Sequence, residues 1–498
     1  MSEKTAPQNM SPAEFRQAGH ELVDQIGDFL ESLPARPITT AATPETVRQL
    51  IGSGGLPAQG KPAGNLLNEV AGILFDHSLH NGHPRFFGYI TSSAAPLGML
   101  ADLLAASINP NISIWEISPV ASEIEAQSIR WIAELIGYPN DGDGITVSGG
   151  NMANILGFIA ARTAKAPWNI RSGGLYAEQR RLTVYASRET HAWVQKAADI
   201  TGLGTDAIRW IETDDQQRID TRALEAHIDQ DLAENCLPFL VIGTAGNVST
   251  GAVDPLARLA QICADRNLWF HVDGAYGAPA AALPEAAEDF DGLGLADSVA
   301  LDPHKWLYTP LEAAVTLVRD PKALVNAFSF RPSYYAFSDD SNERGSDFYE
   351  RGLQNSRGFR ALKVWLGLRQ AGRNGFIESI RANIALAKRL HELAAGHTEL
   401  EACTRHLSLV TFRFVPEGLV PWADSTEQYL NELNQCLLMV LQKGGELFVS
   451  NAVVNGKYLL RACVVNFRTT IHDIDALPDI IVREGRALDA RLRPNGLD

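Results

Sequence analysis

Two short apolar stretches, each ending in a polar turn, constrain this chain more than any other feature. The first runs from Leu268 to Val272 and ends on Asp273, and the second runs from Ser298 to Leu301 and leads to Lys305. Asp273 and Lys305 lie about 30 residues apart, which is the length of one strand–helix–strand unit. Such a unit can place both strand ends at the same edge of a parallel sheet. The sequence therefore predicts that an acid and a lysine meet there.

This pair of residue types matches what pyridoxal phosphate requires of a protein. The amine of Lys305 can form an imine with the cofactor aldehyde, and the carboxylate of Asp273 can keep the ring nitrogen protonated. A protonated ring stabilises the carbanion left when a bond at Cα breaks. Taken alone, Asp273 would be read as a turn cap and Lys305 as a solvated surface lysine. Together, in these two contexts, they favour a cofactor site.

Other predicted strand ends offer groups to the same cofactor. Gly150 and Asn151 begin a helix directly after a strand, so backbone amides there can hold a phosphate, although this signal is weak by itself. His191 follows another strand and could stack on the ring and move protons, whereas a lone histidine is more often structural. The loop from Thr244 to Asp254 could supply polar groups or could simply form a turn.

An irregular segment from Phe330 to Asn355 interrupts the regular pattern. A long loop inside a compact domain is often a mobile lid over a site. Tyr334 on such a lid could protonate the carbanion, or it could be a packed loop tyrosine, and the sequence favours neither interpretation.

The order of predicted elements indicates three parts. Residues 1–82 contain a capped amphipathic helix that begins at Ser11, then a turn-rich stretch to Pro62, and are predicted to pack on another surface such as a second subunit. Residues 83–375 alternate strands and helices, which predicts a mostly parallel sheet covered on both faces. Residues 376–498 predict a smaller α+β domain. The strands predicted in the large domain are 144–147, 182–186, 239–243, 268–272 and 298–301.

Composition excludes several classes of protein. The chain has 498 residues and a net charge of −16, without the clustered Lys and Arg that nucleic-acid binding needs. Its apolar runs are too short to span a bilayer, so no membrane partner is expected. The five scattered cysteines lack CxxC spacing and predict neither a metal site nor disulfides. We expect a cytoplasmic enzyme with reduced thiols.

These motifs resemble those of the group II pyridoxal-phosphate decarboxylases, which include aromatic amino acid, glutamate and histidine decarboxylases. The resemblance covers nearly the whole chain. It implies an α/β, aspartate-aminotransferase-like fold (fold type I) and a homodimer with active sites at the subunit interface. The matching segments are 83–87, 148–154, 271–276, 302–306, 360–365 and 465–470, of which 271–276 and 302–306 are the most specific.

The resemblance implies a role for each predicted site residue. Lys305 would be the Schiff-base lysine, Asp273 the partner of the ring nitrogen, and His191 the ring-stacking residue. Tyr334 matches the lid tyrosine that protonates the carbanion, a position where phenylalanine gives aldehyde synthases. The other cofactor contacts would come from Gly150, Asn151, Ser298 and His304.

Several positions depart from the aromatic decarboxylase pattern. Asp302 replaces an asparagine and puts an acid near the phosphate, Ala192 replaces a serine, and Val248 stands where threonine is common. The predicted substrate pocket also has fewer aromatic residues, and hence less area for stacking on an aromatic substrate. Asn81, Ile90 and Ser113 stand where the aromatic enzymes have aromatic residues, whereas Phe86, Phe87 and Tyr89 remain; the pocket we predict comprises Phe86, Tyr89, Ile90 and Ser113.

The sequence thus predicts decarboxylation of an L-amino acid to its amine and carbon dioxide, with an aromatic amino acid as the first expectation. An acidic amino acid decarboxylase of the glutamate or aspartate type and an aromatic aldehyde synthase are alternatives on the same scaffold. A cofactor-binding scaffold without turnover is an alternative of a different class. The identity of the substrate side chain is left open.

Overall fold

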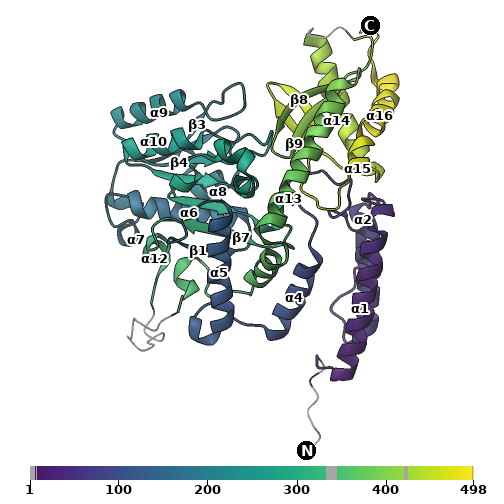
Figure 1. Ribbon diagram of the computed structural model, residues 1–498, viewed down its shortest axis with the longest axis horizontal. Helices are drawn as coiled ribbons and strands as arrows, with labels where there is room; N and C mark the ends of the chain where they lie inside the picture. Colours follow the sequence, from purple (N-terminus) through teal and green to yellow (C-terminus); the bar gives the residue numbers. More distant parts are fainter. Residues whose placement is uncertain (1–5, 7, 332–344, 420–423, 496, 498) are drawn as a thin grey trace, which may run out of the picture.

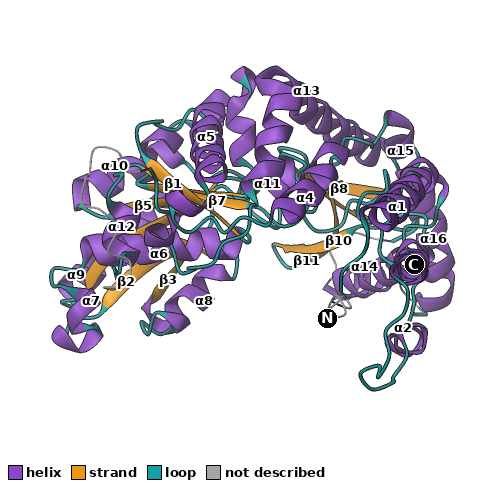
Figure 2. Cartoon of the chain, turned by 90° about the horizontal axis from the view of Figure 1, so that it is seen from below, coloured by secondary structure: helices purple, strands orange, loops and turns teal. Residues whose placement is uncertain are grey.

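The computed structural model describes residues 6, 8–331, 345–419, 424–495 and 497. Two sheets form its framework, and both are seen in Figures 1 and 2. The larger sheet has seven strands in the order β1-β7-β6-β5-β4-β2-β3. β7 is antiparallel to both of its neighbours, whereas all other neighbouring strands are parallel. A mainly parallel sheet confirms the predicted fold class.

The strands of the large sheet are short and deeply buried. All five predicted strands are present, whereas β3 and β7 were not predicted. The bounds are β1 (Asp143–Val147), β2 (Leu182–Ser187), β3 (Ile208–Ile211), β4 (Leu237–Thr244), β5 (Trp269–Asp273), β6 (Ser298–Leu301) and β7 (Ala314–Val318). The helices that pack around this sheet include α5 (Pro119–Leu135), α6 (Gly150–Lys165), α8 (Trp193–Ile200), α9 (Thr221–Ala233), α10 (Leu256–Arg266) and α12 (Ala323–Phe328).

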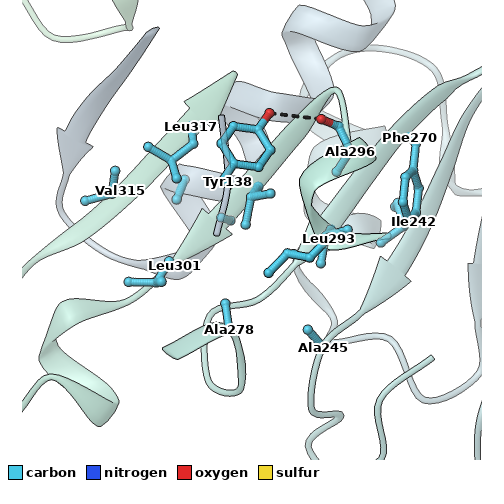
Figure 3. Close-up of a cluster of buried hydrophobic side chains, with 14 of the residues drawn as sticks. Tyr138, Ile242, Ala245, Phe270, Ala278, Leu293, Ala296, Leu301, Val315 and Leu317 are labelled. Carbon is cyan, nitrogen blue, oxygen red and sulfur yellow. Dashed lines mark hydrogen bonds between the residues drawn. The ribbon is translucent and has the colours of Figure 1, made fainter. Parts of the chain in front are cut away.

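Alternation along β5 separates the two faces of the sheet. His271 lies against α6, because a Cβ on Gly157 of that helix would come within 2.7 Å of the His271 ring. Phe270 faces the other way, toward Leu259 of α10 and Gly243 of β4. Figure 3 shows part of the apolar core, with Tyr138 donating its hydroxyl to the carbonyl of Ala296 at 2.9 Å. The sheet is thus buried on both faces, as its near-continuous apolar strands require.

A second, smaller sheet lies at the C-terminal end of the chain. Its four strands are all antiparallel, in the order β10-β11-β9-β8. The long helix α13 (Ala361–Gly396) connects the two sheets and leaves helical geometry at Gly372, where φ is 63° (Figures 1 and 2). The predicted domain boundary at 375 therefore falls inside α13. The other elements are β8 (Leu400–His406), β9 (Leu409–Phe414), α14 (Asp424–Gly444), β10 (Ser450–Val454), β11 (Lys457–Cys463), α15 (Ile471–Asp475) and α16 (Leu477–Leu492).

The N-terminal helices form a separate arm. Ser11 and Glu14 cap the first helix reciprocally, since each backbone N–H donates to the side chain of the other residue. That helix packs on α3 through stacked rings of Phe29 and Phe75, whose centroids are 4.6 Å apart. In Figure 1 the arm, in purple, stands apart from the large sheet. Its helices are α1 (Pro12–Ser32), α2 (Pro44–Ile51), which lies in the stretch predicted to be turn-rich, and α3 (Ala63–His77), and α4 (Pro96–Ile108) follows.

Within the described part of the chain, no helix combines the length and apolar character needed to cross a bilayer.

The close approach of α6 to β5 gives a test of the fold. Gly157→Ala would put a methyl group against the buried His271 ring, so we expect the free energy of unfolding to fall by about 1–3 kcal/mol. Gly367→Ala in α13 is a matched control, because a Cβ there meets no atom within 4 Å. The control should be neutral or about 0.5–1 kcal/mol more stable, since alanine favours helix. Urea unfolding measures both, and equal effects would contradict the packing described.

Candidate active site

The parallel pairing of β5 with β6 brings Asp273 and Lys305 to one edge of the large sheet. Asp273 is the last residue of β5 and lies opposite Ala300 of β6. The chain then passes through Asp302, the N-cap of α11 (Pro303–Trp306), which carries Lys305. The backbone N–H of Asp302 donates to the carbonyl of Ala275 at 3.2 Å, so the two turns that follow the strands are held side by side.

The carboxylate of Asp273 is buried and fixed by two donors. The indole N–H of Trp193 donates to Asp273 Oδ2 at 2.7 Å, and the backbone N–H of Ala275 donates to Oδ1 at 3.2 Å. Trp193 itself is buried and meets the His271 ring edge-on, with centroids 5.6 Å apart. A carboxylate oriented this rigidly suits a fixed partner such as a ring nitrogen.

His191 lies within electrostatic reach of both predicted cofactor residues. Partial desolvation lowers the pKa of His191 below its ordinary value; the Lys305 charge adds to this, whereas the carboxylates of Asp273 and Asp302 oppose it. Its Nδ1 accepts the backbone N–H of Trp193 at 3.2 Å. The ring is therefore neutral near pH 7, with Nε2 carrying the proton, and a neutral imidazole can stack on a flat cofactor ring.

The start of α6 forms one wall of an open cleft of about 710 Å³. Gly150, Asn151, His304 and Glu312 are among the residues that line it. The first amides of a helix have no partner within the helix, so they and the helix dipole can bind an anion. A Cβ at position 150 would lie 2.6 Å from an oxygen of Asp302, so a larger residue there would have to displace that side chain.

Lys305 and His304 share one acid. Lys305 Nζ lies 3.1 Å from Asp302 Oδ2, and His304 Nε2 lies 3.6 Å from the same oxygen. The other nitrogen of His304, Nδ1, lies 2.6 Å from the carbonyl of Ala313 and donates to it. Burial lowers the pKa of His304, although Asp302 opposes this. The three side chains thus stand together beside the α6 N-terminus.

A buried chain of hydrogen bonds supports that N-terminus from inside the sheet. Burial lowers the pKa of His271 to about 4, so its ring is neutral. His271 Nε2 then donates to Asn154 Oδ1 at 2.7 Å, and Asn154 Nδ2 donates to the carbonyl of Gly150 at 2.9 Å. At the other end, Ser298 Oγ donates to His271 Nδ1 at 2.7 Å and accepts the indole N–H of Trp269 at 2.8 Å.

These buried hydrogen bonds give Ser298 a different role from the predicted one. The sequence predicts that Ser298 contacts the phosphate, but Ser298 begins β6, whereas Lys305 follows its end. Its side chain is fully buried, and its hydroxyl is used by His271 and Trp269. The hydroxyl therefore faces the interior and supports the cleft instead of lining it.

Three buried oxygen atoms at this edge have no hydrogen-bond partner among the described residues: Thr190 Oγ1, Thr244 Oγ1 and Asp302 Oδ1. They follow or end β2, β4 and β6, and Thr244 lies opposite Asp273 in the parallel register. Buried polar groups are almost always paired, so unpaired ones at the ends of three neighbouring parts of one sheet edge are consistent with a polar ligand that binds there. The residues present thus fit pyridoxal phosphate.

The loop after β4 is organised as a turn. Asn247 Oδ1 accepts from the backbone amides of Thr250 and Gly251, at 2.8 and 3.1 Å. The carbonyl of Val248 accepts from Arg461 of β11, a buried residue that the sequence analysis did not single out. Its other hydrogen bonds go to Ser450 Oγ, and among the described residues no carboxylate pairs with it. Burial lowers the pKa of Arg461 accordingly.

The predicted substrate-pocket residues lie in separate environments within one chain. Phe86 is buried against Phe448, with ring centroids 5.0 Å apart, whereas Tyr89 is exposed and its centroid is 6.2 Å from that of Phe448. Ile90 packs on the main core. Ser113 is buried elsewhere, and its carbonyl accepts the backbone N–H of Tyr349. Tyr334 lies outside the described residues.

A lysine and an acid at adjacent strand ends, beside an anion-binding helix start, define a pyridoxal-phosphate enzyme of fold type I. The family model for the pyridoxal-dependent decarboxylase conserved domain matches residues 44–415. The chain therefore belongs to the pyridoxal-dependent decarboxylase family.

Individual relatives are similar over almost their whole length. The aromatic-L-amino-acid decarboxylase of Bacillus atrophaeus is 33% identical over 466 residues, which are 93% of this chain and 94% of that protein. The tyrosine decarboxylase 3 of Petroselinum crispum is 30% identical over 487 residues, which are 96% of this chain and 93% of that protein. The crystal structure of Oryza sativa TDC with PLP and tryptamine superposes with a TM-score of 0.89 at 27% identity, covering 97% and 99%.

The depressed pKa of His271 predicts how stability depends on pH. Unfolded histidine has a pKa near 6.5, so between pH 6.5 and 4 the unfolded chain binds a proton that the folded chain does not. The stabilisation is complete above pH 6.5 and falls by about 3 kcal/mol as the pH drops to 4. His271→Gln lacks this titration, so its unfolding free energy should vary less over that range. If the unfolding free energies of the two proteins varied equally with pH, His271 would take up its proton in the folded state too, and the prediction would be wrong.

Proposed function

We propose that this decarboxylase acts on an aromatic L-amino acid, with the cofactor bound between Lys305, Asp273 and the start of α6. The observation that supports the proposal is that Asp273 ends β5 and that Lys305 follows the end of the adjacent parallel strand β6, so both lie at one edge of the sheet. Bound pyridoxal phosphate supplies an aldehyde carbon for covalent attachment and a ring that withdraws electrons from Cα.

Four parts of this chain hold and orient the cofactor in the proposed reaction. Lys305 Nζ holds the cofactor and releases it to the amine of the substrate. Asp273, fixed by Trp193, holds a proton on the ring nitrogen. The neutral ring of His191 packs against one face of the cofactor and keeps water from that side. The amides of Gly150 and Asn151 bind the phosphate at the helix start.

The names of the relatives favour an aromatic substrate. Exposed Tyr89, beside Phe448, provides an aromatic surface near the small domain that suits such a side chain.

Arg461 supports an acidic substrate as a second candidate. A buried guanidinium without a carboxylate partner can bind a carboxylate of the substrate strongly. Arg461 lies near this part of the sheet, because it donates to the carbonyl of Val248 in the loop after β4, and β4 pairs with the strand that ends on Asp273.

Carbon dioxide release from a panel of L-amino acids separates the candidates. We expect release from tyrosine, tryptophan or phenylalanine without hydrogen peroxide, whereas peroxide would indicate an aldehyde synthase. If glutamate or aspartate is turned over instead, and Arg461→Met abolishes that turnover, the acidic substrate is correct. Absence of release from every amino acid, with cofactor bound, would leave a scaffold without turnover.

A visible absorption spectrum tests the covalent link. Lys305→Ala should lose the absorption band of the lysine–cofactor imine and lower the rate of decarboxylation at least about 10³-fold, because the lysine both holds and releases the cofactor. Lys196→Ala is a matched control, since Lys196 is an exposed lysine on the nearby helix α8. The control should keep the band. A band that persists in Lys305→Ala would refute the assignment.

We also propose that the protein is a homodimer built around its N-terminal helices, and that it is cytoplasmic. Leu103 and Ile108 of α4 are more than half exposed, as are Phe15 of α1 and Leu74 of α3. Large apolar side chains exposed on several helices of one region favour an interface. A second subunit would cover it and could bring Ser113 or Tyr334 to the partner's site. Cell fractionation tests the location.

Light scattering after size-exclusion chromatography tests the dimer. The wild type should have twice the chain mass, and Leu103→Glu with Ile108→Glu should shift it toward the monomer, because two charges would be buried at the interface. Leu232→Glu is a control at an exposed apolar position on α9, distant in sequence from the arm. A wild-type monomer, or a dimer insensitive to the α4 changes, would contradict the proposal.

A further inference from the structure

The carboxylate of Asp302 lies beside the start of α6, where the phosphate is proposed above to bind. Its side chain is only 2% exposed, and both of its oxygens lie near the α6 N-terminus, at 2.6 and 3.0 Å from the place of a Cβ on Gly150. Oδ2 pairs with Lys305, whereas Oδ1 has no hydrogen-bond partner among the described residues. The acid is therefore paired with the lysine and lies close to the helix start, so it adds a negative charge beside both.

We propose that Asp302 is the affinity-determining residue of the cofactor site, and that it couples the seating of the cofactor phosphate to the uptake of one proton. This inference rests on the placement of the phosphate at the start of α6 proposed above. A phosphate dianion and a buried carboxylate that converge on one helix start cannot both stay ionised at low cost. Protonation of Asp302 removes the repulsion. It also turns one carboxyl oxygen, Oδ1 or Oδ2, into a hydroxyl that can donate a hydrogen bond to the phosphate.

Among the charged and titratable groups around this position, Asp302 is the one that we expect to take up the proton. Lys305 and His304 of α11 contact it directly, and His191 from the loop before α8 acts on it at longer range. His304 is kept near neutral by burial and gives its other nitrogen to Ala313. Glu312, on the loop before β7, lines the same cleft and pairs with Arg360 at 3.1 Å. An asparagine at 302 would keep an acceptor for Lys305 and add a neutral donor for the phosphate.

Binding of pyridoxine 5′-phosphate to the full-length protein stripped of cofactor tests the proposal, because this ligand has no aldehyde and forms no imine. At pH 8 we expect Asp302→Asn to bind at least tenfold more tightly than the wild type. Since one proton is coupled, the ratio of the two dissociation constants should change about tenfold per pH unit while the carboxylate is ionised. Calorimetry in two buffers of different ionisation enthalpy should show one more proton taken up by the wild type.

Glu312→Gln is the matched control, since it removes one negative charge from the same cleft without touching Lys305. It should change the dissociation constant less than threefold. Equal or weaker binding by Asp302→Asn, equal proton uptake, or an equal gain from Glu312→Gln would each overturn the proposal. If Asp302→Asn does not fold, binding of inorganic phosphate to the wild type at pH 8 decides, because this ion has no ring nitrogen: uptake of one proton supports the proposal, and none overturns it.

A separate variant distinguishes failure of this inference from failure of the placement beneath it. Gly149→Asp puts an anion at the N-cap of α6, where a Cβ meets nothing closer than His304 at 4.0 Å. Loss of pyridoxine 5′-phosphate binding in Gly149→Asp supports the placement, whatever Asp302→Asn does. Unchanged binding in Gly149→Asp would refute the placement and, with it, the role of Asp302.

Discussion

The parallel pairing of β5 with β6 decides where this protein can do its chemistry. The pairing sets Asp273 opposite Ala300, and from there a short turn leads to Lys305. Both residues leave the sheet at its carboxyl edge, where open α/β sheets bind their ligands. The start of α6 and His191 meet them because β1 and β2 end at the same edge. A shift of β6 by one residue would turn its side chains to the other face and separate the acid from the lysine.

Buried polar groups behind the site fix the positions of the residues that line it. Asp273 keeps its orientation through Trp193, and Gly150 keeps its position through Asn154 and a neutral His271. These contacts are buried, so each lost partner would leave an unpaired polar group at a cost of about 1–3 kcal/mol. Asp302, Thr190 and Thr244 are exceptions at this edge, because each has one buried oxygen without a partner among the described residues. Such unpaired atoms lower the stability of the unliganded protein, and a ligand that pairs with them would remove that cost.

Sequence reasoning predicted what is local and missed what is assembled from distant segments. The turns that carry Asp273 and Lys305 are readable because an apolar strand and its polar end are contiguous in the chain. Trp193 and Arg461 were missed, because their roles depend on hydrogen bonds to residues far away in the sequence. Trp193 bonds to Asp273, which is 80 positions away, and Arg461 bonds to Val248, which is 213 positions away. Ser298 was expected at the phosphate, but the motif does not show that it begins β6 and points inward. The strands β3 and β7 were also missed, although β7 is as long as the predicted strands β1 and β5, so length alone does not explain it.

Reduction of the cofactor-loaded protein with borohydride, followed by digestion and mass spectrometry, tests the central claim most directly. Reduction turns the imine into a stable secondary amine and so marks the lysine that holds the cofactor. The account predicts a pyridoxyl phosphate group on the peptide that contains Lys305 and on no other lysine peptide. A label on a different lysine, or an unlabelled Lys305 in a protein that retains the cofactor, would contradict it.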